Sequence, residues 1–197
     1  MTTQAHPTTR RGGRGARRRI LDTATELFYR EGINATGVER LATEASVSKR
    51  TLYQHFPSKT AVVEEYLRRI QEGVGDPIQP GPDAANQTPR ERLLALFSRP
   101  AAGDEQFRGC PFHNAAVEAA HAMPEVQDIV HTHKRNYIRG LTKLAKEAGA
   151  ANPRLLGNQL AVLYEGAAAL ATSLNDPAPW THAQAAARVL IDGALKQ

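Results

Sequence analysis

The sequence has few of the features that would place a protein outside a reducing aqueous compartment. Its 197 residues include a single cysteine, so no intramolecular disulfide can form, as is usual in the reducing cytosol. No apolar run is long enough to cross a bilayer, and no apolar segment of a secretory signal follows the N-terminal arginines. We therefore predict a soluble, cytoplasmic protein of one or two domains, long enough to bury a substantial core.

Motifs for catalysis and for cofactor binding are also lacking. The chain contains no nucleophile elbow, phosphate-binding loop, zinc signature or dinucleotide fingerprint. His113 and His121 are eight residues apart with Glu118 between them, whereas zinc sites on helices more often use residues at i and i+4. We therefore predict no enzyme, no cofactor and no metal site; a helical-bundle enzyme with a basic head is the less favoured alternative.

Positive charge is concentrated at the N-terminal end of the chain. Residues 1–60 contain 11 Lys/Arg and 5 Asp/Glu, whereas residues 61–197 contain 14 and 15. Such a basic excess in one segment is typical of a module that binds a polyanion. Residues 1–16, rich in arginine and glycine, are predicted to form a disordered basic arm. We favour an arm that contacts DNA phosphates or the minor groove over a tail that only increases solubility.

Residues 36–59 have the pattern of a helix-turn-helix. Thr36 and Glu39 have the spacing of a capping box for a first short helix, and Ser48 is placed to cap a second. Leu52 and Phe56 fall on the inner face of that second helix. Its remaining side chains are mostly hydrogen-bond donors that point outward, as a helix in the major groove requires. These outward residues are Lys49, Arg50, Thr51, Tyr53, Gln54 and His55.

The segment RRRILDTATELFYREGINATGVERLATEASVSKRTLYQHFPSKTAVVEEYL resembles the DNA-binding domain of the tetracycline-repressor (TetR) family of bacterial transcriptional regulators. The resemblance covers roughly residues 17–68. It implies a repressor that binds double-stranded DNA as a homodimer on a palindromic operator and that a small-molecule effector releases. Arg50 departs from the family, in which a small residue is common at this position. The predicted DNA contacts are Arg17, Thr36, Ser48, Lys49, Arg50, Thr51, Tyr53, Gln54, His55 and Lys59.

The rest of the chain is predicted to be helical as well. With the DNA-binding domain at residues 17–58 and a regulatory and dimerisation domain at 59–197, we predict an all-α protein of nine helices and no strands. Thr88 and Glu91 form a second capping-box pattern, and Thr181 is placed to cap the last helix. The other predicted helices run over residues 110–122, 124–148 and 152–174.

By resemblance, the C-terminal domain encloses the effector. The predicted effector-binding residues are Phe97, Phe112, His113, His121, Tyr137, Tyr164 and Glu165. Because Glu165 interrupts an apolar stretch, it faces a cationic effector, pairs with an Arg or His, or lies at a wet edge. Cys110, at a predicted helix N-terminus, offers the alternative of a redox-responsive repressor, although a small buried residue is the simpler interpretation. The apolar stripes of the last two long helices serve the core and, in this family, a dimer interface.

Overall fold

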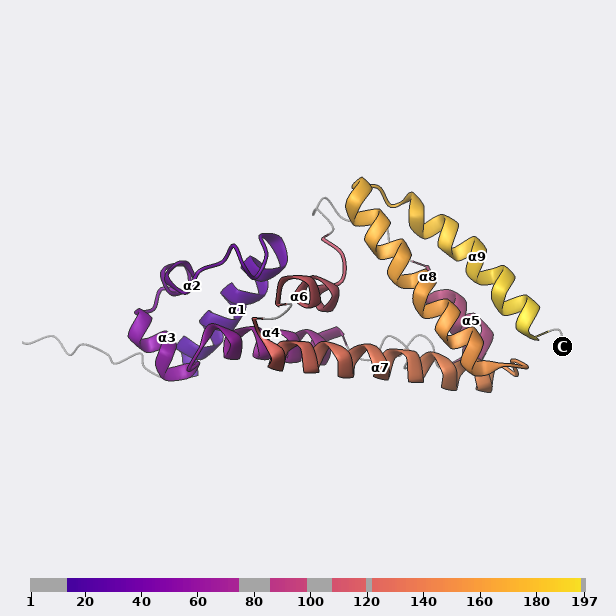
Figure 1. The fold of residues 1–197 in the computed structure, drawn as a ribbon, viewed down its shortest axis with the longest axis horizontal. Coiled ribbons are helices and arrows are strands. Elements are labelled where there is room, and N and C mark those ends of the chain that lie inside the picture. The colour runs from indigo at the N-terminus through magenta and orange to yellow at the C-terminus, as the bar shows by residue number, and fades with distance from the viewer. Residues whose placement is uncertain (1–13, 75–85, 99–107, 120–121, 196–197) are drawn as a thin grey trace, which may run out of the picture. The chain divides into compact units, whose positions relative to one another are not determined.

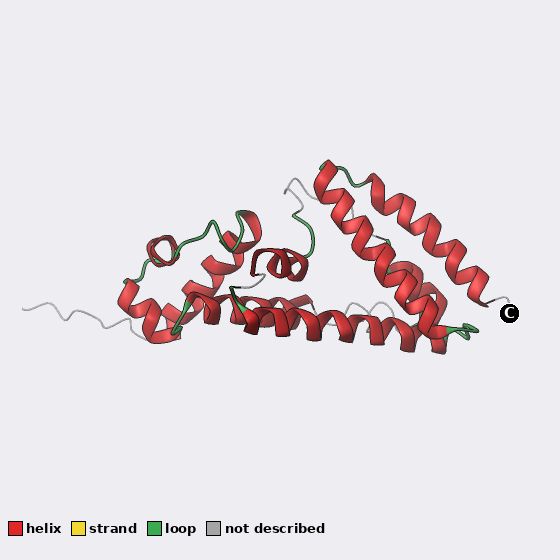
Figure 2. Cartoon of the chain, viewed as in Figure 1, coloured by secondary structure: helices red, strands yellow, loops and turns green. Residues whose placement is uncertain are grey.

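A computed structural model describes residues 14–74, 86–98, 108–119 and 122–195. These residues form nine α-helices and no strand, which confirms the predicted all-α fold (Figures 1 and 2). The helices are α1 (Arg14–Arg30), α2 (Val38–Glu44), α3 (Lys49–His55), α4 (Lys59–Val74), α5 (Pro89–Ala95), α6 (Pro111–Ala119), α7 (Pro124–Glu147), α8 (Pro153–Leu174) and α9 (Ala178–Leu195). Within the described ranges, no helix is both long and apolar enough to cross a membrane.

The chain divides into two compact units, Met1–Tyr66 and Leu67–Gln197. The division lies inside α4, eight residues beyond the predicted boundary at residue 58. The first half of α4 belongs to the N-terminal unit because it contacts α1: the Tyr66 ring meets Phe28 edge-on at 5.5 Å, and Glu65 pairs with Arg17. Helix α1 itself begins at Arg14, so residues 14–16 are helical and not part of a disordered arm. The remainder of the predicted arm lies outside the described residues.

In the N-terminal unit, α1, α2 and α3 pack against one another around a small apolar core. Ile20 and Ala24 of α1 are completely buried, as are Leu41 of α2 and Leu52 of α3. Helix α1 ends at Arg30, and Gly32 follows with a φ of +104°, a left-handed conformation that glycine adopts without steric cost. The predicted helix-turn-helix therefore rests on α1.

Thr36 does not cap α2. That helix begins at Val38 after Gly37, and its N-cap makes no side-chain hydrogen bond. Instead, the completely buried Thr36 hydroxyl donates to the carbonyl oxygen of Gly32 at 2.8 Å. The capping-box prediction was wrong because α2 begins one residue later than predicted, with Gly37 at the N-cap position, and the Thr36 hydroxyl is turned into the interior. The Glu39 carboxylate, which a capping box would have used, is therefore available to another side chain.

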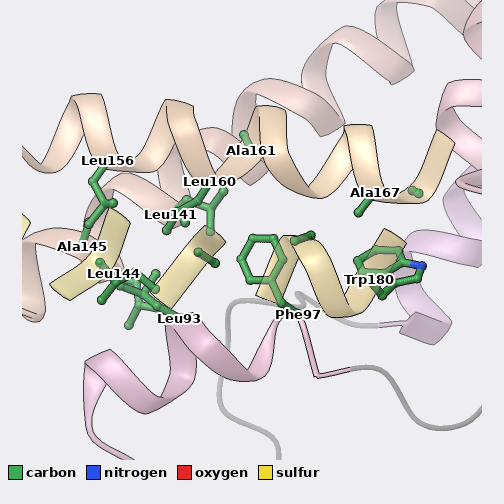
Figure 3. Close-up of a cluster of buried hydrophobic side chains, with 14 of the residues drawn as sticks. Leu93, Phe97, Leu141, Leu144, Ala145, Leu156, Leu160, Ala161, Ala167 and Trp180 are labelled. Atoms are coloured by element: carbon green, nitrogen blue, oxygen red, sulfur yellow. The ribbon is translucent and has the colours of Figure 1, made fainter. Parts of the chain in front are cut away.

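In the C-terminal unit, α7, α8 and α9 pack in sequence, and α5 covers α7 and α9. Leucines from α5, α7 and α8 fill one end of the core, and Phe97 and Trp180 extend it toward the other (Figure 3). Helices α7 and α8 approach most closely at Gly157. A Cβ atom there would lie 2.8 Å from the backbone nitrogen of Thr142, so only glycine fits without a shift of the helices.

The predicted capping residues can be compared with the observed first turns of the helices in this unit. The Thr88–Glu91 capping box is present, and the Asn152 side chain caps α8 by accepting from the backbone N–H of Leu155. Thr181 is not a cap, since α9 begins earlier, at Ala178. The Asp176 carboxylate accepts from the N–H of Ala178 at 2.8 Å and so satisfies a donor of its first turn. Helix α6 reaches Ala119, the last described residue before a gap, and the predicted end at residue 122 lies in a turn.

Candidate nucleic-acid interface

Helix α3 presents a polar face to solvent while two apolar anchors hold it in place. Leu52 and Phe56 are buried, as predicted. Lys49, Arg50 and Gln54 are exposed, and Tyr53 has 43% of its surface accessible. Because the inner face fixes α3 against α1, the exposed side chains project from a rigid support. Thr51 and His55 lie at the margin of this face and are half-buried.

The start of α3 is set by Ser48. Its hydroxyl oxygen accepts from the backbone N–H of Thr51 at 3.0 Å, which confirms the predicted cap. The Ser48 and Thr51 hydroxyls also lie within hydrogen-bond distance, at 2.8 Å. Just before this cap, Ser46 adopts a φ of +51° in the turn that reverses the chain after α2. Ser48 thus orients the first turn of α3, from which Lys49 and Arg50 project.

Two of the ion pairs in this unit involve residues of α2. Both guanidinium nitrogens of Arg40 donate to the two carboxylate oxygens of Glu31, and these hydrogen bonds lower the pKa of Glu31. Lys49 donates from Nζ to Oε1 of Glu39 at 2.9 Å, which lowers the pKa of Glu39 and raises that of Lys49. Arg50 forms no ion pair with any described residue, so its charge is available to an external partner.

Arg17 has a role inside the domain. Its guanidinium pairs with Glu65 of α4 and lies over the Phe56 ring, 5.2 Å from the ring centre. These contacts join α1, the end of α3 and the start of α4. The Arg17 side chain is still 46% exposed.

The remaining predicted DNA contacts, Lys59 and Thr36, differ in how far they are exposed to solvent. Lys59 begins α4 and is half-buried. Thr36 cannot contact DNA through its side chain, because that side chain is completely buried beneath the surface. We therefore withdraw it from the predicted contacts.

In the C-terminal unit, several predicted effector residues come together. Tyr164 is central to this aromatic cluster: its ring centre lies 6.0 Å from that of Phe97 and 5.6 Å from that of Tyr137. Trp180 completes the cluster at 5.0 Å from Tyr164. Sequence reasoning missed Trp180, which stands next to the supposed cap of α9 and is instead buried in its first turn.

Polar groups border this aromatic cluster. Glu165 accepts from Nζ of Lys134 at 2.5 Å, which settles its partner as a lysine of α7, and the same nitrogen lies 3.5 Å from Sγ of Cys110. The buried Tyr137 hydroxyl has no hydrogen-bond partner among the described residues. Burial raises the pKa of this phenol well above its ordinary value, with further contributions from Tyr164 and Glu165. The phenol is therefore neutral and can still donate a proton to a hydrogen bond.

The remaining predicted effector residues lie apart from the rings of the cluster. Phe112 is buried and stacks on His133 at 3.5 Å, while His113 is exposed. His121 lies outside the described residues. Among the residues that are described, no group of three or more His, Cys, Asp or Glu side chains is arranged to hold a metal ion.

Helices α8 and α9 also carry apolar side chains on their outward faces. Val162 of α8 and Val189 of α9 are 74% and 72% exposed. Leu155 and Leu170 of α8 are more than half exposed, and small exposed residues surround Val189. We call these outward residues the α8–α9 apolar face; they are Leu155, Val162, Gly166, Ala169, Leu170, Ala185, Ala186, Val189 and Gly193. Large exposed apolar patches mark interaction sites more often than free surface.

Comparison with known proteins gives matches over both units. Residues 20–66 match the family "Bacterial regulatory proteins, tetR family", and residues 89–187 match "Tetracyclin repressor-like, C-terminal domain". The HTH-type transcriptional repressor KstR2 of Rhodococcus jostii is 42% identical over 57 residues, which cover 29% of this chain and 28% of that protein. The match thus spans less than a third of this curated relative.

Two solved structures are similar over nearly the whole chain. A protein of Streptomyces avermitilis assigned as a TetR transcriptional regulator (sav143) superposes with a TM-score of 0.78 at 31% identity, covering 91% of this chain and 97% of that one. SCO4454, a TetR-family transcriptional regulator of Streptomyces coelicolor, gives a TM-score of 0.76 at 28% identity, with 92% and 96% covered.

Proposed function

Because the chain belongs to the tetracycline-repressor (TetR) family of bacterial regulatory proteins, we propose that it is a transcriptional repressor without enzymatic activity. It binds a palindromic operator as a homodimer, and a small-molecule effector releases it. The observation that carries this proposal is the polar, solvent-exposed face of α3 on a buried apolar support. The R. jostii relative is named a transcriptional repressor, whereas FasR of Mycolicibacterium smegmatis, 38% identical over 83 residues, is named an activator.

The exposed side chains of α3 have two kinds of task on DNA. Lys49 and Arg50 match guanine acceptors, and Gln54 matches adenine. The other proposed contacts position the helix through the phosphates and carry no sequence information. They are Arg17, Tyr53, His55 and Lys59, with Ser48 capping the helix, whereas Thr51 faces base edges together with Lys49, Arg50 and Gln54.

Two lysine variants separate these tasks. Lys49→Ala is expected to relax base preference at one operator position. Lys59→Ala is expected to weaken binding to every sequence and to reduce the salt dependence by about one unit of slope. Gel shifts against operator variants at several salt concentrations measure both. If both variants lost the same affinity on every sequence, the assignment of Lys49 to base edges and of Lys59 to phosphates would be wrong.

The α8–α9 apolar face is the proposed dimer interface. A single α3 reads only a few base pairs, so a two-fold dimer with half-sites about 34–36 Å apart, or a multiple of this, doubles the contacts. Small residues on both helices, Gly166 and Ala169 on α8 and Ala185 and Gly193 on α9, permit two helix pairs to approach closely. Four large apolar side chains of this face, Leu155, Val162, Leu170 and Val189, are more than half exposed in the single chain, which supports burial in a dimer.

We place the effector at the aromatic cluster of Phe97, Tyr137, Tyr164 and Trp180, bordered by Glu165. Aromatic walls with a few polar groups are typical of small-molecule sites. The unpaired Tyr137 hydroxyl offers a hydrogen bond to a ligand, and Glu165, paired with Lys134, offers a charge. Release from DNA requires the effector to bind more tightly to the form of the repressor with low DNA affinity.

The experiment that tests this function selects genomic fragments with the purified full-length protein at moderate salt and sequences them. Recovery of one or a few palindromes is expected, and the neighbouring genes would indicate effectors to test for release. Recovery of unrelated fragments, with affinity that collapses as salt rises, would leave only sequence-independent phosphate binding and refute a specific repressor.

A further inference from the structure

The Glu39–Lys49 ion pair joins the first turns of the two helices of the helix-turn-helix. Glu39 lies in the first turn of α2, and Lys49 is the first residue of α3. Lys49 Nζ and Glu39 Oε1 are 2.9 Å apart, while 52% of the lysine and 84% of the glutamate side chain remain exposed. The pair therefore lies at the surface, where an ion pair contributes little to the free energy of folding.

The chemistry of the ammonium allows Lys49 to keep this pair while it binds DNA. An ammonium has three donor protons, and Glu39 uses one of them. The other two are free to reach the guanine acceptors in the major groove. A phosphate contact is different, because the lysine would have to carry Glu39 toward a like charge or leave it. The carboxylate thus restricts where the lysine can donate.

We propose that Glu39 is a positioning residue that holds Lys49 toward base edges and away from the phosphate backbone, so that it increases operator specificity. This inference rests on the proposed DNA-binding function. Without Glu39, the flexible four-carbon side chain of Lys49 would reach phosphates on any sequence. Non-specific binding would then gain a contact that operator binding does not need.

The arrangement of the other charges makes this role particular to Glu39. Arg50, the neighbour of Lys49, has no ion pair among the described residues, so no carboxylate restricts where it can donate. Arg40 is held by both of its guanidinium nitrogens on Glu31 at the end of α1. Glu44, the last residue of α2, is exposed and has no ion pair with α3. It therefore supplies a matched control for the removal of one negative charge from the same helix.

The test compares Glu39→Gln, Glu44→Gln, Lys49→Gln and the Glu39→Gln/Lys49→Gln double variant of the full-length protein. The probes are a 30-base-pair duplex carrying the selected operator and a scrambled duplex of the same composition, each titrated at several salt concentrations. Circular dichroism verifies that the variants, all at exposed positions, are folded.

Relative to Glu44→Gln, Glu39→Gln is expected to increase affinity for the scrambled duplex about two- to fivefold, the range of an exposed ion pair. It should also steepen the salt dependence on that duplex by about 0.9 in logarithmic slope. The operator-to-scrambled affinity ratio should fall by a similar factor. Both effects should vanish in the Lys49→Gln background, because the glutamate acts through that lysine.

Three results would overturn the proposal. One is an unchanged slope and affinity on the scrambled duplex, and another is an equal increase on both duplexes, which would make Glu39 a simple competitor for Lys49. The third is an effect of the same size in the Lys49→Gln background. Failure of the proposed function is distinguishable, because wild-type protein would then select no operator at all, whereas here the wild type retains its operator.

Discussion

Substitution of one valine in the α8–α9 apolar face should break the proposed dimer. Val162 and Val189 are about three-quarters exposed in a single chain. Burying a valine completely contributes about 1.5 kcal/mol at the low end, so the exposed part is worth about 1 kcal/mol for each copy. A two-fold dimer contains the residue twice, so the substitution removes about 2 kcal/mol of association free energy. Burial of the introduced carboxylate would weaken the dimer further. Val162→Glu or Val189→Glu should therefore raise the dimer Kd at least about 30-fold.

Sedimentation equilibrium over a range of protein concentrations measures this Kd. Val117→Glu is the matched control, since Val117 of α6 is 65% exposed and lies outside the α8–α9 apolar face. It should leave the dimer Kd unchanged. If Val162→Glu and Val189→Glu stayed as dimeric as the control, the exposed valines would be ordinary surface residues and the α8–α9 apolar face would not be the dimer interface.

Three further variants test the close packing of α7 on α8, the buried Tyr137 hydroxyl and the cap of α3. Gly157→Ala should lower the thermal midpoint, since overpacking of about 1–3 kcal/mol against the Thr142 backbone outweighs the roughly 1 kcal/mol gain in helix propensity; an unchanged midpoint would contradict the close helix approach. Tyr137→Phe should stabilise the protein by about 1 kcal/mol in denaturant titrations by removing a buried hydroxyl without a partner. Because the pKa of Tyr137 is raised in the folded protein, the phenol ionises only in the unfolded chain above about pH 10, and the wild type loses stability as the pH rises beyond that value. The variant should show a weaker alkaline loss, and identical pH profiles would refute this. Ser48→Ala should cost about 1 kcal/mol and weaken operator binding because α3 loses its cap to Thr51, whereas unaltered stability would show the cap to be unnecessary.

Features that depend on neighbours in the chain were predictable from the sequence. Ser48 caps α3, and Leu52 and Phe56 are buried beneath its polar face, as the short-range pattern predicted. The Thr88–Glu91 capping box was predictable for the same reason. In each case the partners are three or four residues apart, so helix geometry alone brings them together.

Contacts of side chains that have several possible hydrogen-bond or ion-pair partners were not predictable from the sequence. Thr36 has the right spacing from Glu39 for a capping box, but its hydroxyl donates to Gly32 instead. Glu39 consequently pairs with Lys49, across the turn between α2 and α3. Likewise, Asp176 and Thr181 are both common cap residues, and only the observed start of α9 distinguishes them.

The candidate effector site was predictable in part. Aromatic residues of the C-terminal domain pointed to Phe97, Tyr137 and Tyr164, which do meet in the core. The lysine partner of Glu165 is 31 residues away on another helix, and no local pattern indicates it. Packing of α7 on α8 creates this pair, so the fold had to be known first.

Sequence-specific DNA binding is tested by comparing affinity for a selected operator with affinity for a scrambled duplex of the same length at physiological salt. A sequence-specific repressor predicts two protomers on the operator and a preference of about a thousandfold or more. Similar affinities for both duplexes, falling together as salt rises, would contradict the claim and leave a general DNA-binding protein.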